Sequence, residues 1–350
     1  MAENYKKYTQ VEHVLERPGM YVGDTKDVIT DCWVVNTETN TAHIKTCKWN
    51  PGIFKIFDEI LTNATDEVQR NKKMSCIKVD ISDDGTISVY NDSGIPIEIH
   101  PEYKIYIPEL IFANLLTTSN HDDTKKRTTG GLNGLGAKLA AIFSETFTVE
   151  TASSGKKYTQ TFEKNLSNIL KPKIGKSVKE YTKITFKPDF KRFGVDSLNE
   201  DTRDILIRRI FDICAITPRG VDVYYNSKNL SVKDFSEYIS VYIGPKKSCP
   251  RVIQETGRWQ VAIAPSDNGF QCISFVNGVN TTDGGSHVDH VVNPIIKKIT
   301  ETIQEKHKNL TIKPHYVKDN IFVFINCIIE NPSFSSQTKE KHITKVSEFG

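Results

Sequence analysis

Three polar side chains of a predicted helix have the types and the spacing that chemistry on water or on a metal ion needs. Glu59, Asn63 and Asp66 lie on one face, within about 60° of the helix circumference at about 100° per residue. They flank the apolar stripe of the helix, so we expect them at the boundary between core and solvent. There a carboxylate can act as a general base for water, and an amide oxygen one turn later can complete a Mg²⁺ shell. The same pattern is also typical of an ordinary solvated helix edge.

A glycine-rich segment follows, with four glycines among residues 130–136 and then an apolar helix. Such a loop lets backbone amides approach an anion at the start of a helix. The P-loop pattern is excluded because Ala137 separates Gly136 from Lys138. The Rossmann pattern is excluded because Leu139 takes the place of its last glycine. The segment therefore predicts either a less common phosphate-binding loop or a flexible loop before a helix.

Asn91 ends a predicted strand and begins the sequence Asn-Asp-Ser-Gly-Ile-Pro. An amide side chain at this position could read the edge of a nucleotide base through paired hydrogen bonds. Taken alone, the segment is equally consistent with an ordinary turn.

The composition narrows the class of protein. The chain has 350 residues, 38% of them hydrophobic and 25% charged, which predicts a soluble globular protein. Its net charge of +3 is too small to attract polyanions over the whole surface. Its seven cysteines form no C-x-x-C pair, which argues against a disulfide framework or a zinc ribbon. No secretory signal is visible and no apolar run approaches about 18 residues, so we expect no membrane partner.

The elements that must position these residues mix helices and strands without strict alternation, which predicts an α+β fold. The expected helices are residues 52–69, 108–116, 136–143, 199–214 and 288–306. The expected strands are residues 77–81, 86–90, 147–151, 157–162, 183–186, 259–264, 272–276 and 321–329, with another beginning near residue 221. A soft boundary near Ser231 divides the chain into predicted domains of residues 1–231 and 232–350.

The order of the motifs carries more information than any one of them. A helix with E-x3-N, then N-x2-G-I-P, then G-x-x-G-x-G resembles the Bergerat-fold (GHKL) ATPases. Residues 8–18 resemble the opening of a type IIA DNA topoisomerase, residues 275–289 its transducer and residues 330–340 its phosphate-sensing loop, in the eukaryotic rather than the gyrase form. The resemblance implies a GHKL sandwich of helices on a mixed sheet over residues 1–231. It also implies a transducer of the ribosomal-protein-like βαβ type over residues 232–350.

The resemblance also implies a role for each matching residue. Glu59 is the expected general base, Asn63 the Mg²⁺ ligand and Asn91 the contact on the adenine side. The residues expected around ribose and phosphates are Thr118, Ser119, Asn120, Gly131, Leu132, Asn133, Gly134, Leu135, Gly136, Ala137 and Lys138. Gln337, Thr338 and Lys339 are expected to reach the γ-phosphate from the second domain, with Gln337 and Lys339 counted as catalytic, and Tyr5 to reach the nucleotide of a partner subunit.

The implied activity is an ATP- and Mg²⁺-dependent N-gate, in which dimerisation captures a DNA segment for strand passage. Double-stranded DNA would contact Lys306, Lys308 and Lys313, and the cleavage core with its tyrosine would lie further along the same polypeptide. The implied location is the nucleus, or a cytoplasmic replication site if the protein is viral. Two alternatives are another GHKL clamp, of the mismatch-repair or chaperone kind, and a nucleotide-locked DNA clamp without turnover.

Four residues depart from the pattern of the family. Leu132 stands where eukaryotic relatives have arginine, Asp92 where glycine is common, and Glu67 where asparagine is expected. Ser286 replaces an arginine between Gly285 and His287. None of these changes removes the expected base, metal ligand or γ-phosphate lysine.

Overall fold

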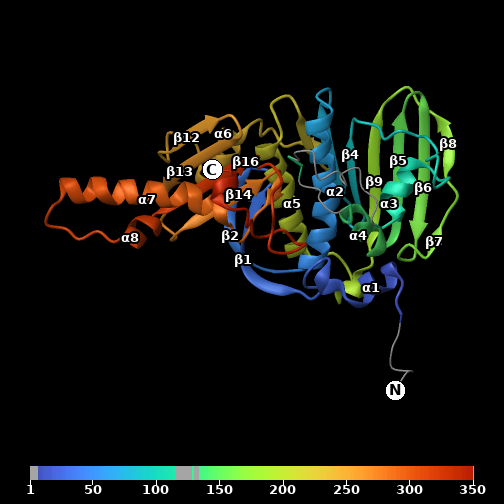
Figure 1. Cartoon of the computed structure of the whole chain (residues 1–350), viewed down its shortest axis with the longest axis horizontal. Coiled ribbons are helices and arrows are strands. Elements are labelled where there is room, and N and C mark those ends of the chain that lie inside the picture. The colour runs from blue at the N-terminus through green and yellow to red at the C-terminus, as the bar shows by residue number, and fades with distance from the viewer. Residues whose placement is uncertain (1–6, 116–127, 130–133, 350) are drawn as a thin grey trace, which may run out of the picture. The chain divides into compact units, whose positions relative to one another are not determined.

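The computed structural model of the chain describes residues 7–115, 128–129 and 134–349. Contacts within it separate two compact units. Unit 1 takes the described residues 7–115 and 134–233, and unit 2 takes residues 234–349 with residues 128–129. No sheet among the described residues is shared between the two units (Figure 1).

The described part of unit 1 is built on a sheet of nine strands, ordered β11-β10-β3-β4-β9-β5-β6-β7, with β8 also paired to β6. Most neighbours are antiparallel, whereas β10 is parallel to β3, which makes the sheet mixed. The strands are β3 (Cys76–Ile81), β4 (Ile87–Asn91), β5 (Ser144–Ser153), β6 (Lys156–Glu163), β7 (Asn168–Ile169), β8 (Lys173–Lys176), β9 (Tyr181–Pro188), β10 (Asp222–Tyr225) and β11 (Lys228–Asn229).

The central helix of unit 1 is α2 (Pro51–Arg70), close to its predicted span. Its apolar stripe, which includes Ile56, Phe57 and Ile60, is buried, and the helix packs against α4 (Gly136–Ile142), α5 (Glu200–Ile216) and β4. The burial of one continuous stripe explains why helical periodicity alone locates this element. The other helices of the unit are α1 (Gln10–Glu16) and α3 (Ile107–Ala113), with single 3₁₀ turns at residues 18–20 and 190–193.

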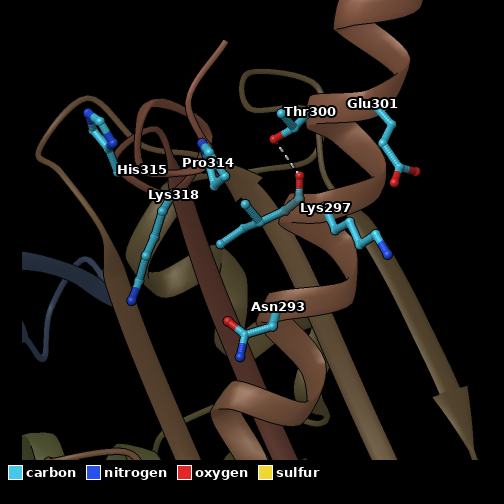
Figure 2. A pocket seen from close by; sticks show the side chains of 8 residues that line it. Asn293, Lys297, Thr300, Glu301, Pro314, His315 and Lys318 are labelled. Carbon is cyan, nitrogen blue, oxygen red and sulfur yellow. Dashed lines mark hydrogen bonds between the residues drawn. The ribbon is translucent and has the colours of Figure 1, made fainter.

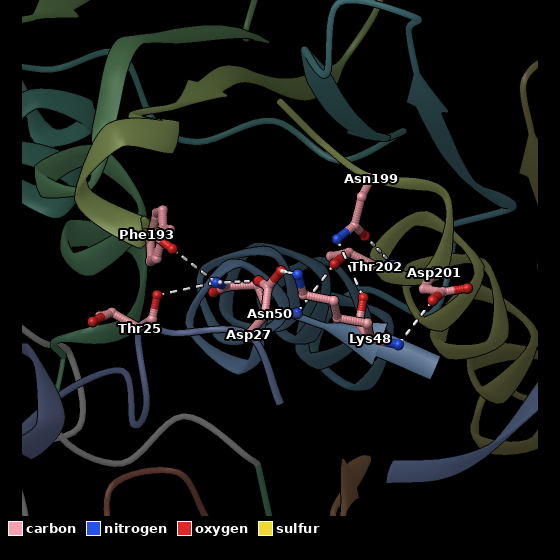
Figure 3. Close-up of polar contacts among 8 residues, drawn as sticks. All are labelled: Thr25, Asp27, Lys48, Asn50, Phe193, Asn199, Asp201 and Thr202. Atoms are coloured by element: carbon pink, nitrogen blue, oxygen red, sulfur yellow. Dashed lines mark hydrogen bonds and ion pairs between the residues drawn. The ribbon is translucent and has the colours of Figure 1, made fainter. Parts of the chain in front are cut away.

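One asparagine side chain fixes the start of α2. Asn50 is fully buried, and its Oδ1 accepts a hydrogen bond from the amide of Ile53. Its Nδ2 donates to the carbonyl of Thr25 at 3.0 Å and to that of Phe193 at 3.1 Å (Figure 3). The Asn50 amide donates in turn to the hydroxyl of Thr202 in the first turn of α5. The N-cap of α2 therefore also ties it to three other segments of the unit.

A hairpin that the sequence analysis did not predict covers part of α5. Its strands β1 (Val28–Asn36) and β2 (Thr41–Trp49) are antiparallel and form a separate sheet. Cys47 and Val34 are buried with Ile205 of α5, whereas most other positions of the two strands are partly or fully exposed. This mixed burial produces no clear alternation in the sequence.

Unit 2 contains a sheet ordered β12-β13-β16-β14-β15 in the part that the structure describes. β14 and β16 are parallel, so the chain between them must cross over, and it does so through the long helix α7 (Figure 1). The strands are β12 (Val252–Thr256), β13 (Trp259–Pro265), β14 (Gln271–Val276), β15 (Val279–Asn280) and β16 (Ile321–Cys327), and the helices are α6 (Phe235–Ile243), α7 (Ser286–Lys306), α8 (Pro314–Lys318) and α9 (Val346–Phe349).

Strand β16 is covered on both faces. Val323 and Ile325 belong to the core cluster that holds Val292 of α7. The alternate residues Phe322 and Phe324 lie against Tyr242 of α6, with ring centroids 6.4 and 5.8 Å away. This double burial accounts for the continuous apolar run in the sequence. The strand ends at Cys327, two residues before its predicted end.

None of the helices in the described residues is long and apolar enough to cross a bilayer.

Candidate nucleotide site

Glu59 lies near the middle of α2 and is 5% exposed. Its Oε1 is 2.6 Å from Nζ of Lys55, one turn earlier, and Lys55 is buried as well. The ion pair fixes one oxygen of the carboxylate within a low-dielectric environment, where a charge needs a partner. Lys55 had no predicted role, although its i, i+4 spacing from Glu59 is visible in the sequence.

The other oxygen of Glu59 faces the start of α4. A Cβ atom added to Gly136 would lie 1.8 Å from Oε2 of Glu59 and 2.6 Å from its Cδ. Only glycine leaves room for the carboxylate at this point. The structure therefore brings the end of the glycine-rich segment into contact with the predicted base.

The two other polar residues of the helix face differ in exposure. Asn63 is exposed, whereas Asp66 is 5% exposed. No group of three or more His, Cys, Asp or Glu side chains suited to a metal ion occurs among the described residues. A Mg²⁺ ion here would have to use an oxygen such as that of Asn63 together with water and phosphate ligands, which is a donor set that Mg²⁺ accepts.

Lys138 is buried on α4, and its ammonium donates a hydrogen bond to the carbonyl of Gly134. Burial lowers the pKa of Lys138 to about 8. Gly134, Leu135 and Ala137 lie beside it in the described part of the segment. A cation that is costly to bury is thus held at the end of the glycine-rich segment.

A cavity of about 470 Å³ adjoins the same segment of unit 1. It was not predicted, because its walls come from sequence positions more than 100 residues apart. Its lining includes Tyr8, His13, Val14, Tyr21, Leu115 and Leu135.

Asn91 occupies the end of β4 and is 6% exposed. Its Nδ2 lies 3.5 Å from the carbonyl oxygen of Ser93, and the same carbonyl accepts a hydrogen bond from Thr182 of β9 at 2.7 Å. The amide is therefore held at the strand end, on the sheet that supports α2.

The loop that carries Gln337, Thr338 and Lys339 belongs to unit 2. Lys339 is 4% exposed and has a backbone φ of 63°, an uncommon value for a residue other than glycine. The hydroxyl of Thr338 donates to the carboxylate of Glu340 at 3.0 Å. These residues are ordered by local contacts within their own unit.

The three lysines predicted to meet DNA lie around the connection between α7 and α8. Lys306, Lys308 and Lys313 are all exposed. Gln304 of α7 fixes this connection, because its side chain bonds the carbonyl of Leu310 and the amide of Ile312. A cavity of about 410 Å³ lies between the two helices, lined by Asn293, Ile296, Lys297, Thr300, Glu301, Pro314, His315 and Lys318 (Figure 2).

Seven of the predicted site residues lie outside the described part of the chain, so the structure does not test them. They are Tyr5, Thr118, Ser119, Asn120, Gly131, Leu132 and Asn133.

Comparison with known proteins assigns a family to both units. Residues 50–191 match the family of histidine kinase-, DNA gyrase B- and HSP90-like ATPases, and residues 222–348 match the DNA gyrase B family. The chain is 44% identical to the crystallised ATPase region of topoisomerase II from Saccharomyces cerevisiae, with a TM-score of 0.93, and covers 100% of itself and 93% of that structure. The chain belongs to the topoisomerase II family.

Other relatives agree with this assignment. The ATPase and transducer domains of topoisomerase II from Balamuthia mandrillaris share 40% identity and a TM-score of 0.92, over 99% of this chain and 91% of that one. DNA topoisomerase 2 of Candida albicans is 46% identical over 100% of this chain, which spans about a quarter (26%) of that protein. A gyrase B ATPase domain from Thermus thermophilus, at 19% identity and a TM-score of 0.62, shares the fold.

The predicted family and the α+β fold of a GHKL ATPase with a transducer are therefore confirmed, and the chain is the ATPase region of a topoisomerase II. None of these relatives favours a mismatch-repair or chaperone clamp.

Glu67 and Asp92, which the resemblance marks as departures, have visible local roles. Glu67 accepts a hydrogen bond from the hydroxyl of Ser93 at 2.8 Å, beside Asn91. Asp92 accepts bonds from the amides of Ser75 and Cys76 and from the Ser75 hydroxyl. Burial opposes ionisation of Asp92, but these hydrogen bonds outweigh it and lower its pKa. Asp92 thus joins the end of β4 to the start of β3.

Proposed function

We propose that this topoisomerase II ATPase region binds ATP with Mg²⁺ and hydrolyses it, with Glu59 as the general base. One observation carries the proposal. A buried carboxylate has one oxygen fixed by Lys55 and the other against Gly136, at the end of the glycine-rich segment, in a chain of an ATPase family.

In the proposed reaction a water oxygen attacks the γ-phosphorus while Glu59 accepts the water's proton. The bond from the γ-phosphorus to its bridging oxygen breaks, leaving ADP and phosphate. Because charge shifts to the phosphate oxygens, Lys138 and Lys339 would stabilise the transition state, with Gln337 and Thr338 positioning the second lysine.

The remaining nucleotide contacts follow the family pattern. Asn91 would bind the adenine side, and Thr118, Ser119, Asn120 and residues 131–137 would surround the ribose and phosphates. Asn63 would hold Mg²⁺, which supplies positive charge to the phosphates when bound.

At the level of the whole protein we propose a homodimeric nuclear enzyme. Tyr5 of each subunit would reach the partner's nucleotide, and residues 1–231 and 232–350 would act as ATPase domain and transducer. Nucleotide contacts that exist only in the closed dimer would favour closure around double-stranded DNA, with Lys306, Lys308 and Lys313 facing it. Cleavage of the DNA would belong to the rest of the polypeptide.

The test is the steady-state release of phosphate by Glu59→Gln and Glu59→Ala, with binding of ATP measured separately. We expect both variants to bind ATP and to turn over at least about 10²-fold more slowly, the scale of losing a general base. Glu200→Gln, which changes an exposed glutamate of α5, is the control and should keep the wild-type rate. Equal rates in all the proteins would remove Glu59 from its proposed role.

A second variant addresses the γ-phosphate. Lys339→Ala should lose hydrolysis more than binding of ADP, because the γ-phosphate, its proposed partner, is absent from ADP. A chain that binds ATP tightly but releases no phosphate even as wild type would instead be a nucleotide-locked clamp.

A further inference from the structure

The loop that carries Lys339 is closed at its base by hydrogen bonds within unit 2. The amide of Ile343 donates to the carbonyl of Ser333 at 2.9 Å, and the amide of Ser333 donates to the hydroxyl of Thr344 at 2.8 Å. Further along the loop, the amide of Ser335 donates to the carbonyl of Lys341. Residues 333–344 therefore form a closed loop, which we call the 333–344 loop.

This loop is also joined to the segment that begins α7. The amide of His342 donates to the carbonyl of Gly284 at 3.0 Å, and the amide of Ser286 donates to the carbonyl of His342 at 3.1 Å. A Cβ atom at Gly285 would lie only 2.0 Å from that His342 oxygen, so the two backbones touch where Gly285 has no side chain. The first residue of α7 is thus bonded directly to the loop.

The Ser286 side chain adds two further bonds. Its hydroxyl lies 2.6 Å from the carbonyl oxygen of Thr344 and 3.1 Å from Nδ1 of His342. A hydroxyl has one proton, and the carbonyl can only accept, so the proton of Ser286 goes to Thr344. Nδ1 of His342 must then carry a proton and donate it to Ser286. The serine therefore links two positions of the loop base.

The ring of His342 is fully buried and packs edge-on against His287, with centroids 5.1 Å apart. Burial lowers the pKa of His342 to about 4 and that of His287 to about 3, the latter also through the neighbouring His342. Both rings are therefore neutral near pH 7, which agrees with a single donated proton at Nδ1. The bond between Ser286 and His342 therefore does not change with pH near pH 7.

We infer that Ser286 and His342 are positioning residues for Lys339, which they hold by fixing the base of the 333–344 loop to the first turn of α7. The inference rests on the role of Lys339 in the proposed function. Lys339 keeps an uncommon backbone conformation, and such a conformation persists only where its surroundings hold it. The side chain of Ser286 is short enough for its hydroxyl to lie between His342 and Thr344.

Amide hydrogen exchange of the nucleotide-free chain tests the contact itself. Ser286→Ala and His342→Leu should speed exchange in residues 333–344, whereas Ser286→Thr and His342→Asn should not, because they keep the hydroxyl and a donor near the Nδ1 position. Ser266→Ala is the matched control, since Ser266 is a buried serine of unit 2 that also donates to a carbonyl at 2.6 Å. Unchanged exchange in Ser286→Ala and His342→Leu, or equal acceleration in Ser266→Ala, would overturn the inference.

Turnover tests the consequence for Lys339. In Ser286→Ala and His342→Leu we expect kcat for ATP to fall by about tenfold to a hundredfold, the scale of a misplaced catalytic group, with unchanged affinity for ADP. The double variant should be no worse than the more damaged single one, because either single variant already removes the bond between Ser286 and His342. If Lys339→Ala keeps full turnover, the proposed function fails. If Lys339→Ala loses turnover and these variants do not, the positioning role alone fails.

Discussion

Nε of Arg209 on α5 donates to Oδ1 of Asp58 on α2 at 2.6 Å, and both side chains are buried. Asp58 immediately precedes Glu59, so this ion pair fixes the part of α2 that carries the proposed base to its neighbouring helix. A buried pair of this kind need not add net stability compared with apolar residues, but losing one partner leaves a charge without compensation.

We therefore expect Arg209→Met to lower the free energy of unfolding by about 3–5 kcal/mol, measured by urea denaturation. Asp58→Leu combined with Arg209→Met should recover part of the loss, since the charge of Asp58 is removed as well and the buried Asp212, which also lies 4.0 Å from Arg209, keeps Arg208 as a partner. Lys45→Met, which breaks a more exposed pair with Asp201 and Asp204, should cost less than about 1 kcal/mol. A similar small cost for Arg209→Met would contradict the role assigned to the pair.

Gly136→Ala should slow ATP hydrolysis by at least about tenfold. The new methyl group would occupy the position of Oε2 of Glu59, so either the carboxylate or the start of α4 must move, and such displacements are costly at a reacting centre. Phosphate release is the measurement. Gly175→Ala, at a site with open space around the added atom, should behave as wild type. Full activity in Gly136→Ala would show that the carboxylate acts from another position.

We expect Lys138 to make nucleotide binding depend on pH. Its folded-state pKa is lowered from 10.5 to about 8, so at higher pH the free protein has lost the proton that a bound phosphate would favour. We expect the Kd for ATP to be constant below pH about 8 and to weaken above it. Lys138→Met should bind more weakly at neutral pH and lose this dependence. The same slope in the variant would assign the proton to another group.

The same shift affects stability with a definite sign. Between pH about 8 and 10.5 the unfolded chain holds the proton that the folded chain has released, so unfolding becomes less favourable as pH rises. The free energy of unfolding of wild type should therefore increase relative to Lys138→Met across this window. Chemical denaturation at several pH values measures it, and parallel curves would contradict the assignment.

The exposed lysines around the connection between α7 and α8 predict that DNA binding depends on the salt concentration. Changing Lys306, Lys308 and Lys313 together to alanine should weaken binding of double-stranded DNA and reduce the slope of log K against log salt by up to about 2–3, because each phosphate contact contributes about 0.9. The same three-charge change at Lys171, Lys173 and Lys176, which are exposed in unit 1, is the control. An equal loss of slope in the control would indicate attraction by net charge alone.

Elements with one strong pattern could be predicted from the sequence. The apolar stripe of α2 and the continuous apolar run of β16 reflect burial that a local pattern reports directly. The β1–β2 hairpin could not be found this way, because most of its positions are partly exposed and its packing depends on α5, more than 150 residues later.

In the candidate site, too, only features with a local sequence pattern could be predicted. The placement of Glu59 and Asn63 on one helix follows from their spacing. The approach of Gly136 to Glu59 joins segments 77 residues apart, and the bond from Ser286 to His342 joins segments 56 residues apart. Neither contact has a local signature, since only the tertiary packing decides which backbone needs a glycine and which hydroxyl meets a ring.

The double burial of β16 makes the strand a reporter for the whole of unit 2. Its amides are bonded along both edges, and both its faces are covered, so they can meet solvent only when the surrounding structure comes apart. The slowest-exchanging amides of Val323, Phe324 and Ile325 should therefore measure the global opening of this unit, separately from the motion of any loop attached to it.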